Sequence, residues 1–160
     1  MDIVLQDMNY KFNKSEMIIH IVNPTFDGEM RKSIVNVNFK YGLQCSANAS
    51  ISDSTFIQEI KQNIWWTQYD IDRLYEDVSI ISKYESAKSK QHLHICVSEY
   101  CYINLLEQEF SILCRTFEDV VFLYICCGTS GIGPAIQLTV TKKQFLNWAE
   151  NIKQCFYKNF

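Results

Sequence analysis

The clearest pattern in this chain is a strict alternation of apolar and polar residues from Val35 to Ile51. Successive side chains of a strand point to opposite faces of a sheet, so the alternation predicts strands with one buried and one solvated face. Gly42 interrupts the pattern without changing its parity, which predicts a three-residue hairpin turn at Lys40, Tyr41 and Gly42. A sheet with one wet face favours an antiparallel α+β protein over a buried parallel sheet.

Further strands are expected where the same period returns or where an apolar run is short. The predicted strands cover residues 17–22, 33–39, 43–51, 93–97, 110–114, 120–127 and 132–140. The run at 120–127 is apolar throughout, which predicts a central strand covered on both faces.

Helical periodicity indicates two helices in the middle of the chain. A capping-box spacing that starts at Thr55 precedes an apolar stripe and predicts a helix over residues 54–64. A second stripe, capped by Asp70, predicts a helix over residues 71–81. Residues 78–82 also have the alternation of a short strand, and propensity separates the two alternatives only weakly.

The chain is expected to end in a further helix. Thr141 and Gln144 have the spacing of a capping box, and an apolar stripe continues from them to about residue 157. These elements predict an α+β fold, with a mainly antiparallel sheet of about six strands covered by two or three helices. The length of 160 residues fits one globular domain over residues 1–160.

Composition and charge narrow the class of protein. Hydrophobic residues make up 48% of the chain and charged residues 21%, which argues against intrinsic disorder. The longest apolar stretch, residues 120–127, is far too short to span a membrane, and the first residues lack the features of a signal peptide. We therefore expect a cytoplasmic protein without membrane contact. A net charge of -3 argues against direct binding of nucleic acid.

The seven cysteines form no Cys-x-x-Cys pair, so they are interpreted as small buried apolar residues rather than as a disulfide or metal framework.

His92, His94 and Cys96 alternate and would share one face of a strand, at a spacing that zinc would accept, yet no second pair completes four ligands. A histidine pair that includes His20 would suit an acid–base nuclease. The glycine-rich loop at 128–133 lacks the ending of a phosphate loop. We assign no metal, cofactor or catalytic residue.

Two further features have both a structural and a functional interpretation. Trp65 and Trp66 fit large core aromatics or an exposed anchor for a partner. A run of four carboxylates falls on the second predicted helix, where it would form a band on the solvent side: Asp70, Asp72, Glu76 and Asp77. Such a band is either an ordinary solvated face or a negative surface that steers a basic partner.

The order of these elements resembles that of a protein family. A strand ending at residues 43–47, a helix at 56–61, strands from residue 93 onward and a closing strand at 138–140 before the last helix resemble the immunity proteins of bacterial polymorphic-toxin and contact-dependent growth inhibition systems. The stripe at 71–81 is additional to that layout. The resemblance implies stoichiometric binding and neutralisation of a cognate toxin domain, often a nuclease, without catalytic residues.

On that basis the expected contact surface consists of acidic side chains on the second helix and in the following segment: Asp70, Asp72, Glu76, Asp77, Glu107 and Glu109. Two other functions stay open. One is a small metal- or histidine-dependent enzyme that uses His92 and His94. The other is an adaptor domain whose sheet edge takes a partner strand.

Overall fold

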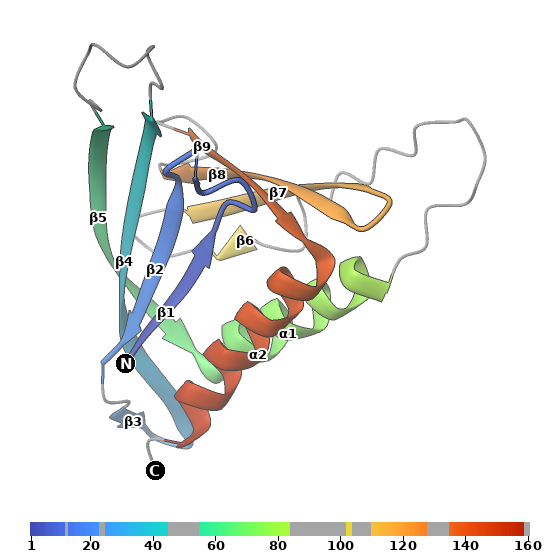
Figure 1. Ribbon diagram of the computed structural model, residues 1–160. Helices are drawn as coiled ribbons and strands as arrows, with labels where there is room; N and C mark the ends of the chain where they lie inside the picture. The colour runs from blue at the N-terminus through green and yellow to red at the C-terminus, as the bar shows by residue number, and fades with distance from the viewer. Residues whose placement is uncertain are drawn as a thin grey trace.

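The computed structural model describes residues 1–11, 13–22, 25–44, 55–83, 102–103, 110–127 and 135–158. These residues form two antiparallel sheets and two helices (Figure 1). The predicted α+β class, the antiparallel pairing and the C-terminal helix are confirmed. The strands are divided between a five-stranded sheet, sheet A, and a four-stranded sheet, sheet B.

Sheet A is built around one long strand. Its members are β1 (Asp2–Gln6), β2 (Glu16–Ile21), β3 (Thr25–Asp27), β4 (Met30–Gln44) and β5 (Thr55–Thr67). One edge of β4 pairs with β2 and β3, its other edge pairs with β5, and β1 pairs with β2. The strand β1 was not among the sequence predictions.

The predicted turn at Lys40–Gly42 is wrong, because β4 runs through it without a break. Gly42 pairs with Ile57 inside the β4–β5 ladder. The alternation keeps its parity across Gly42 for a simpler reason than an odd-length turn, since the strand simply continues. The part of the pattern at 45–51 lies outside the described residues.

The predicted helix at 54–64 is also wrong, because residues 55–64 belong to β5. Ile60 and Ile64 are spaced by four, which satisfies the helical period and the strand period equally. Pairing with β4 decides between them, and Ile64 and Trp66 are buried on the inner face. Trp65 points outward and is 49% exposed, so the core interpretation holds for Trp66 alone.

Sheet B has the order β6-β7-β8-β9. Its strands are β6 (Tyr102–Ile103), β7 (Phe110–Phe117), β8 (Val120–Cys127) and β9 (Ala135–Thr141). The strands predicted from 110, 120 and 132 are confirmed for their described parts, whereas residues 93–97 and the loop 128–133 lie outside them. β8 is interior to the sheet, but Leu123 and Ile125 are buried while Tyr124 is 37% exposed. The prediction that both faces of β8 are covered is therefore wrong.

The helices α1 (Gln68–Lys83) and α2 (Lys142–Lys158) lie side by side against the inner faces of the sheets (Figure 1). Of the three predicted helices, the one at 71–81 and the C-terminal one are confirmed, and the alternative of a strand at 78–82 is wrong. α1 contacts α2, β4 and β5, whereas α2 contacts β1, β2, β8 and β9. The buried residues form a single hydrophobic core, whose largest fully buried side chains include Trp66, Phe39, Phe145 and Phe156.

The start of α2 has the predicted capping box. The backbone N–H of Thr141 donates to Oε1 of Gln144 at 2.9 Å, and the N–H of Gln144 donates to Oγ1 of Thr141 at 3.1 Å. These two bonds satisfy N–H groups that have no partner inside the helix, so they fix where α2 begins after β9.

One buried carboxylate joins the two sheets. Asp7 follows β1 and is 3% exposed. Its Oδ2 accepts hydrogen bonds from the backbone N–H of Thr139 on β9, at 2.7 Å, and from Nδ2 of Asn13, at 3.0 Å. Its Oδ1 accepts from the N–H of Asn9, and the N–H of Met8 donates to the carbonyl of Thr139. The end of β1 is thereby anchored beside β9.

Candidate functional site

The helix α1 carries the four carboxylates that the sequence places there, and the structure gives each a different environment. Asp70 belongs to the start of the helix. Its Oδ2 accepts hydrogen bonds from the backbone N–H and from Oγ1 of Thr67, both at 2.8 Å. The N–H of Asp70 lies 3.4 Å from Oγ1 of Thr67. The cap is therefore Thr67 rather than Asp70, and the Asp70 carboxylate is held close to the positive end of the helix dipole.

Asp72 connects α1 to α2. Its Oδ1 lies 2.9 Å from Nζ of Lys153, and its Oδ2 accepts a hydrogen bond from the hydroxyl of Tyr157 at 2.8 Å. Burial, together with the hydrogen bond and charge of Asp72, raises the pKa of Tyr157 to about 12, although the charge of Arg31 opposes this. The Lys153 ammonium also lies 4.8 Å from the ring centre of Tyr75. The Asp72 side chain remains 43% exposed, so one side of the carboxylate still faces solvent.

Asp77 does not belong to the solvated band that the sequence predicted. Only 7% of its side chain is exposed, because position 77 lies between the buried residues Leu74 and Ile81 on the helix surface. Its Oδ2 is buried and accepts no hydrogen bond from any described residue. Burial raises the pKa of Asp77 from 3.8 to about 6; Arg73, with Nε at 3.8 Å, lowers this pKa, and the negative charge of Glu76 raises it.

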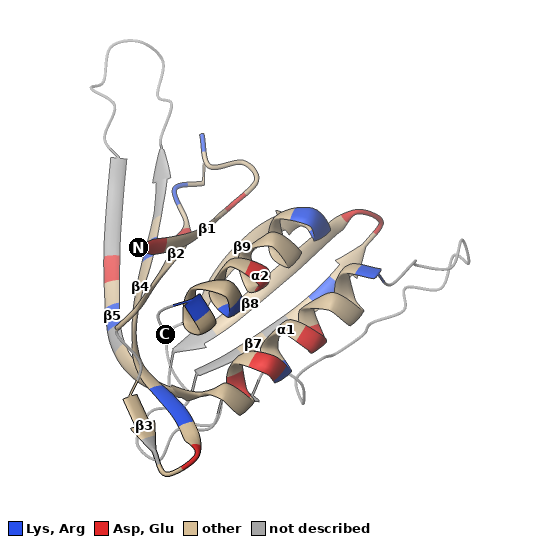
Figure 2. Cartoon of the chain, turned by 90° about the horizontal axis from the view of Figure 1, so that it is seen from below, with Lys and Arg blue, Asp and Glu red and all other residues tan. Residues whose placement is uncertain are grey.

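These side chains border an open depression of about 450 Å³ on the outer side of α1. The described residues that line it are Gln68, Tyr69, Asp72, Arg73, Glu76 and Asp77. Several positions along α1 are acidic, and the neighbouring helix α2 has basic positions (Figure 2). Two large apolar side chains of α1 are also exposed, Tyr69 at 72% and Ile80 at 64%. The carboxylates at the depression could bind a cationic group of another molecule, and Tyr69 and Ile80 could contact apolar groups beside it.

Sequence reasoning missed Tyr69 and Ile80. Both fall outside the apolar stripe formed by Ile71, Leu74 and Val78, and this is the signal that would have identified them as exposed.

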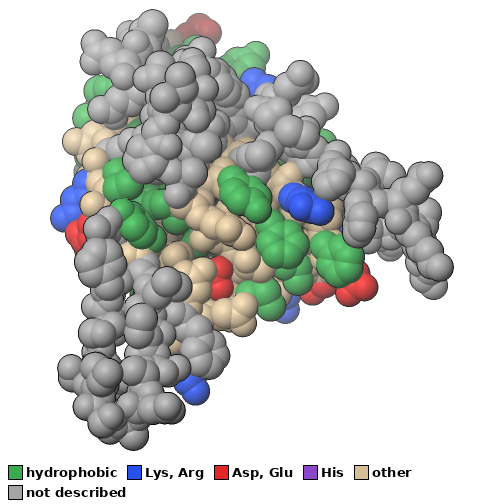
Figure 3. Space-filling view, turned by 90° about the horizontal axis from the view of Figure 1, so that it is seen from above, with side chains coloured by type: hydrophobic (Ala, Val, Ile, Leu, Met, Phe, Trp, Pro, Cys, Tyr) green, Lys and Arg blue, Asp and Glu red, His purple; other side chains and the backbone are tan. Residues whose placement is uncertain are grey.

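A second exposed apolar area lies on the outer face of sheet B. Hydrophobic side chains gather over this sheet in the view from above (Figure 3). Phe117 is 54% exposed and Tyr124 is 37% exposed, and Phe122 is half-buried opposite Arg115 in the β7–β8 ladder. No signal in the sequence indicated Phe122 and Tyr124, because the run 120–127 is apolar throughout and has no alternation that would show which side chains face outward.

The other sequence candidates are His20 and residues that the structure does not describe. Glu107, Glu109, His92, His94 and Cys96 lie outside the described residues. His20 lies on β2, where its Nδ1 is 2.9 Å from Oδ1 of Asp2 on the exposed side of the strand pair. Among the described residues, no three His, Cys, Asp or Glu side chains are grouped so that they could hold a metal ion.

Comparisons with known proteins add no relative. No family model matches the chain, no curated protein matches it, and no solved structure matches its fold. Neither of the described helices has the length and apolar character needed to cross a membrane.

Proposed function

We propose that this chain is a protein-binding domain that takes a basic partner on the outward face of α1 and neutralises it by stoichiometric masking, as immunity proteins do with their cognate toxin domains. The class of partner comes from the resemblance of the sequence elements to that family. In the structure the helix at 56–61 of that layout is part of β5, whereas the closing strand before the last helix is present. The choice of surface comes from the geometry of α1.

The observation that carries the proposal is the Asp77 carboxylate. It is almost fully buried, it lacks a hydrogen bond from any described residue at Oδ2, and it borders a depression that Glu76 and Asp72 also line. The Arg73 guanidinium forms an ion pair with Asp77, but at 3.8 Å it is too far away to donate a hydrogen bond to Oδ2. Burying a carboxylate with an incomplete set of hydrogen bonds is costly in a folded protein. An ammonium or guanidinium group from a partner, seated in the depression, would add positive charge and donors beside this carboxylate, and charge-assisted hydrogen bonds are strong where water is excluded.

Apolar contact completes the surface. Tyr69 and Ile80 are large, exposed and placed on the same side of α1 as Glu76. Interfaces combine apolar anchors, tyrosine above all, with a polar rim that contributes mainly to steering and specificity. Glu76 is exposed and is expected to act on the association rate, whereas Tyr69 is expected to act on the dissociation rate.

The test begins with the neighbouring genes. If an upstream gene encodes a large secreted protein with a variable C-terminal domain, that domain is co-expressed with this chain. We expect protection of growth and a one-to-one complex on gel filtration. Tyr69→Ala with Glu76→Lys is expected to weaken the complex by about tenfold or more. The matched control is Glu29→Lys, which makes the same charge change at an exposed turn of sheet A and should leave the affinity unchanged.

Two results would contradict the proposal at different levels. Absence of both a complex and protection would reject the inhibitory function. A complex whose dissociation constant is the same for wild type, the α1 double variant and Glu29→Lys would reject α1 as the contact surface.

A further inference from the structure

The outer edge of β5 is long, and no strand of the described residues covers it. β5 has thirteen residues and pairs with β4 from Thr67 to Thr55. Its opposite edge pairs with no strand in the described part of the chain. Natural sheets usually blunt such an edge with short strands, prolines, bulges or several charges, because unpaired N–H and C=O groups are a template for another strand. β5 contains no proline and has Lys61 as its single basic residue.

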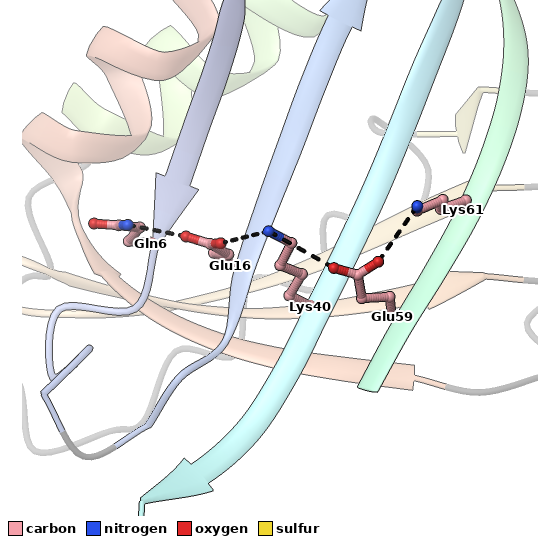
Figure 4. A network of polar contacts seen from close by, with 5 residues as sticks. All are labelled: Gln6, Glu16, Lys40, Glu59 and Lys61. Carbon is pink, nitrogen blue, oxygen red and sulfur yellow. Dashed lines mark hydrogen bonds and ion pairs between the residues drawn. The ribbon is translucent and has the colours of Figure 1, made fainter. Parts of the chain in front are cut away.

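A row of polar side chains crosses sheet A and ends at this edge (Figure 4). Gln6 donates to Glu16 at 2.9 Å, and Lys40 lies 3.6 Å from Glu16 and 3.7 Å from Glu59. Lys61 lies 3.4 Å from Glu59 on the same strand. The charges therefore alternate across the strands, and the last two members, Glu59 and Lys61, both belong to β5.

The spacing of these two charges is self-complementary. When two copies of β5 pair antiparallel about a two-fold axis perpendicular to the sheet, paired residue numbers must have an even sum for the faces to match. A register centred on Ile60 places Glu59 of each copy opposite Lys61 of the other. The neighbouring registers, centred on Glu59 or on Lys61, place like charges directly opposite one another, which is unfavourable.

We propose that two copies of this chain associate through their β5 edges, antiparallel and in the register centred on Ile60, so that two copies of sheet A become one continuous sheet. This self-association goes beyond the proposed inhibitory function and does not depend on it. A two-fold interface of this kind is closed, since each copy uses its one β5 edge and leaves no further edge of that kind for a third copy.

The experiment is sedimentation velocity of the full chain over a range of concentrations, with circular dichroism to confirm that each variant is folded. Wild type is expected to be a dimer. Lys61→Glu places Glu opposite Glu at two symmetric positions and is expected to weaken the dimer by about tenfold or more. Glu59→Lys with Lys61→Glu exchanges the two charges and is expected to restore it. Lys143→Glu, an exposed change of equal charge on α2, should have no effect.

A wild-type chain that remains monomeric at high concentration would overturn the proposal. A dimer that is equally stable in wild type and Lys61→Glu would do so too, because the association would then use another surface. If Lys61→Glu is not folded, Lys61→Gln removes the attraction without adding a charge, and the same comparison applies with a smaller loss of affinity.

Discussion

Replacing Asp77 with asparagine tests the central feature of the proposed binding surface. Asparagine has nearly the same shape as aspartate but carries no charge, so the variant removes the buried charge while keeping the packing between Leu74 and Ile81. If the carboxylate is desolvated and its Oδ2 lacks a hydrogen-bond donor, the variant should be more stable than wild type near neutral pH.

The magnitude follows from the pKa of Asp77. A carboxyl whose pKa is higher in the folded state than in the unfolded chain favours folding only while it is protonated. The stabilisation is fully present below about pH 4 and is lost as the pH rises through about 6. The pKa difference between 3.8 in the unfolded chain and about 6 in the folded protein corresponds to a loss of about 3 kcal/mol in folding stability at pH values above 6. Because residual solvent at the rim screens the charge, we expect a measured difference of about 2 kcal/mol.

The assay is urea denaturation followed by tryptophan fluorescence between about pH 4 and pH 8. The free energy of unfolding of Asp77→Asn is expected to exceed that of wild type by about 2 kcal/mol at pH 7.5, and the two should converge towards pH 4. Glu150→Gln is the matched control, since Glu150 is an exposed carboxylate on α2 and its neutralisation should change stability by less than about 0.5 kcal/mol.

A variant that is less stable than wild type at pH 7.5 would refute this reasoning, because it would mean that Asp77 makes favourable interactions as a charged group. A stability difference that does not depend on pH would refute it as well.

Two further predictions concern the fold. Asp7→Ala leaves the buried N–H of Thr139 and the side-chain amide of Asn13 without their acceptor. We therefore expect the free energy of unfolding to fall by about 2–4 kcal/mol. A loss below about 0.5 kcal/mol in urea denaturation would contradict the structural role of Asp7. Thr141→Ala removes the cap of α2 and is expected to lower the free energy of unfolding by about 1 kcal/mol. The control is Lys143→Ala, on the exposed side of the same turn, which should cause no measurable change. Equal stabilities of these two variants in thermal denaturation would count against the capping box.

Local signals in the sequence predicted the helices better than they predicted the strands next to them. The capping box of Thr141 and Gln144 and the stripe that includes Phe145 and Trp148 are short-range features, and both occur in α2 as expected. In β5 the same kind of short-range evidence misled, because the four-residue spacing of Ile60 and Ile64 fits both periods. Only the ladder with β4, formed by residues distant in the sequence, selects the strand.

The candidate site shows a similar limit. The sequence places Asp72, Glu76 and Asp77 on one helix, and the structure confirms that much. The sequence does not show how far the neighbouring elements extend over the surface of α1. It therefore cannot distinguish the buried Asp77 from the exposed Glu76. The engagement of Asp72 by Lys153 and Tyr157 depends on the packing of α2 against α1, which no pattern within α1 encodes.

The junction between β5 and α1 has a consequence for regulation. The strand ends at Thr67 and the helix begins at Gln68, with no linker between them, and the hydrogen bonds between Thr67 and Asp70 stiffen the joint. A neighbouring strand that paired with β5 and changed its twist would therefore also shift the first turn of α1. Energetic coupling of this kind is reciprocal, so the proposed self-association and the proposed binding of a partner on α1 would alter each other's equilibrium constant by the same factor.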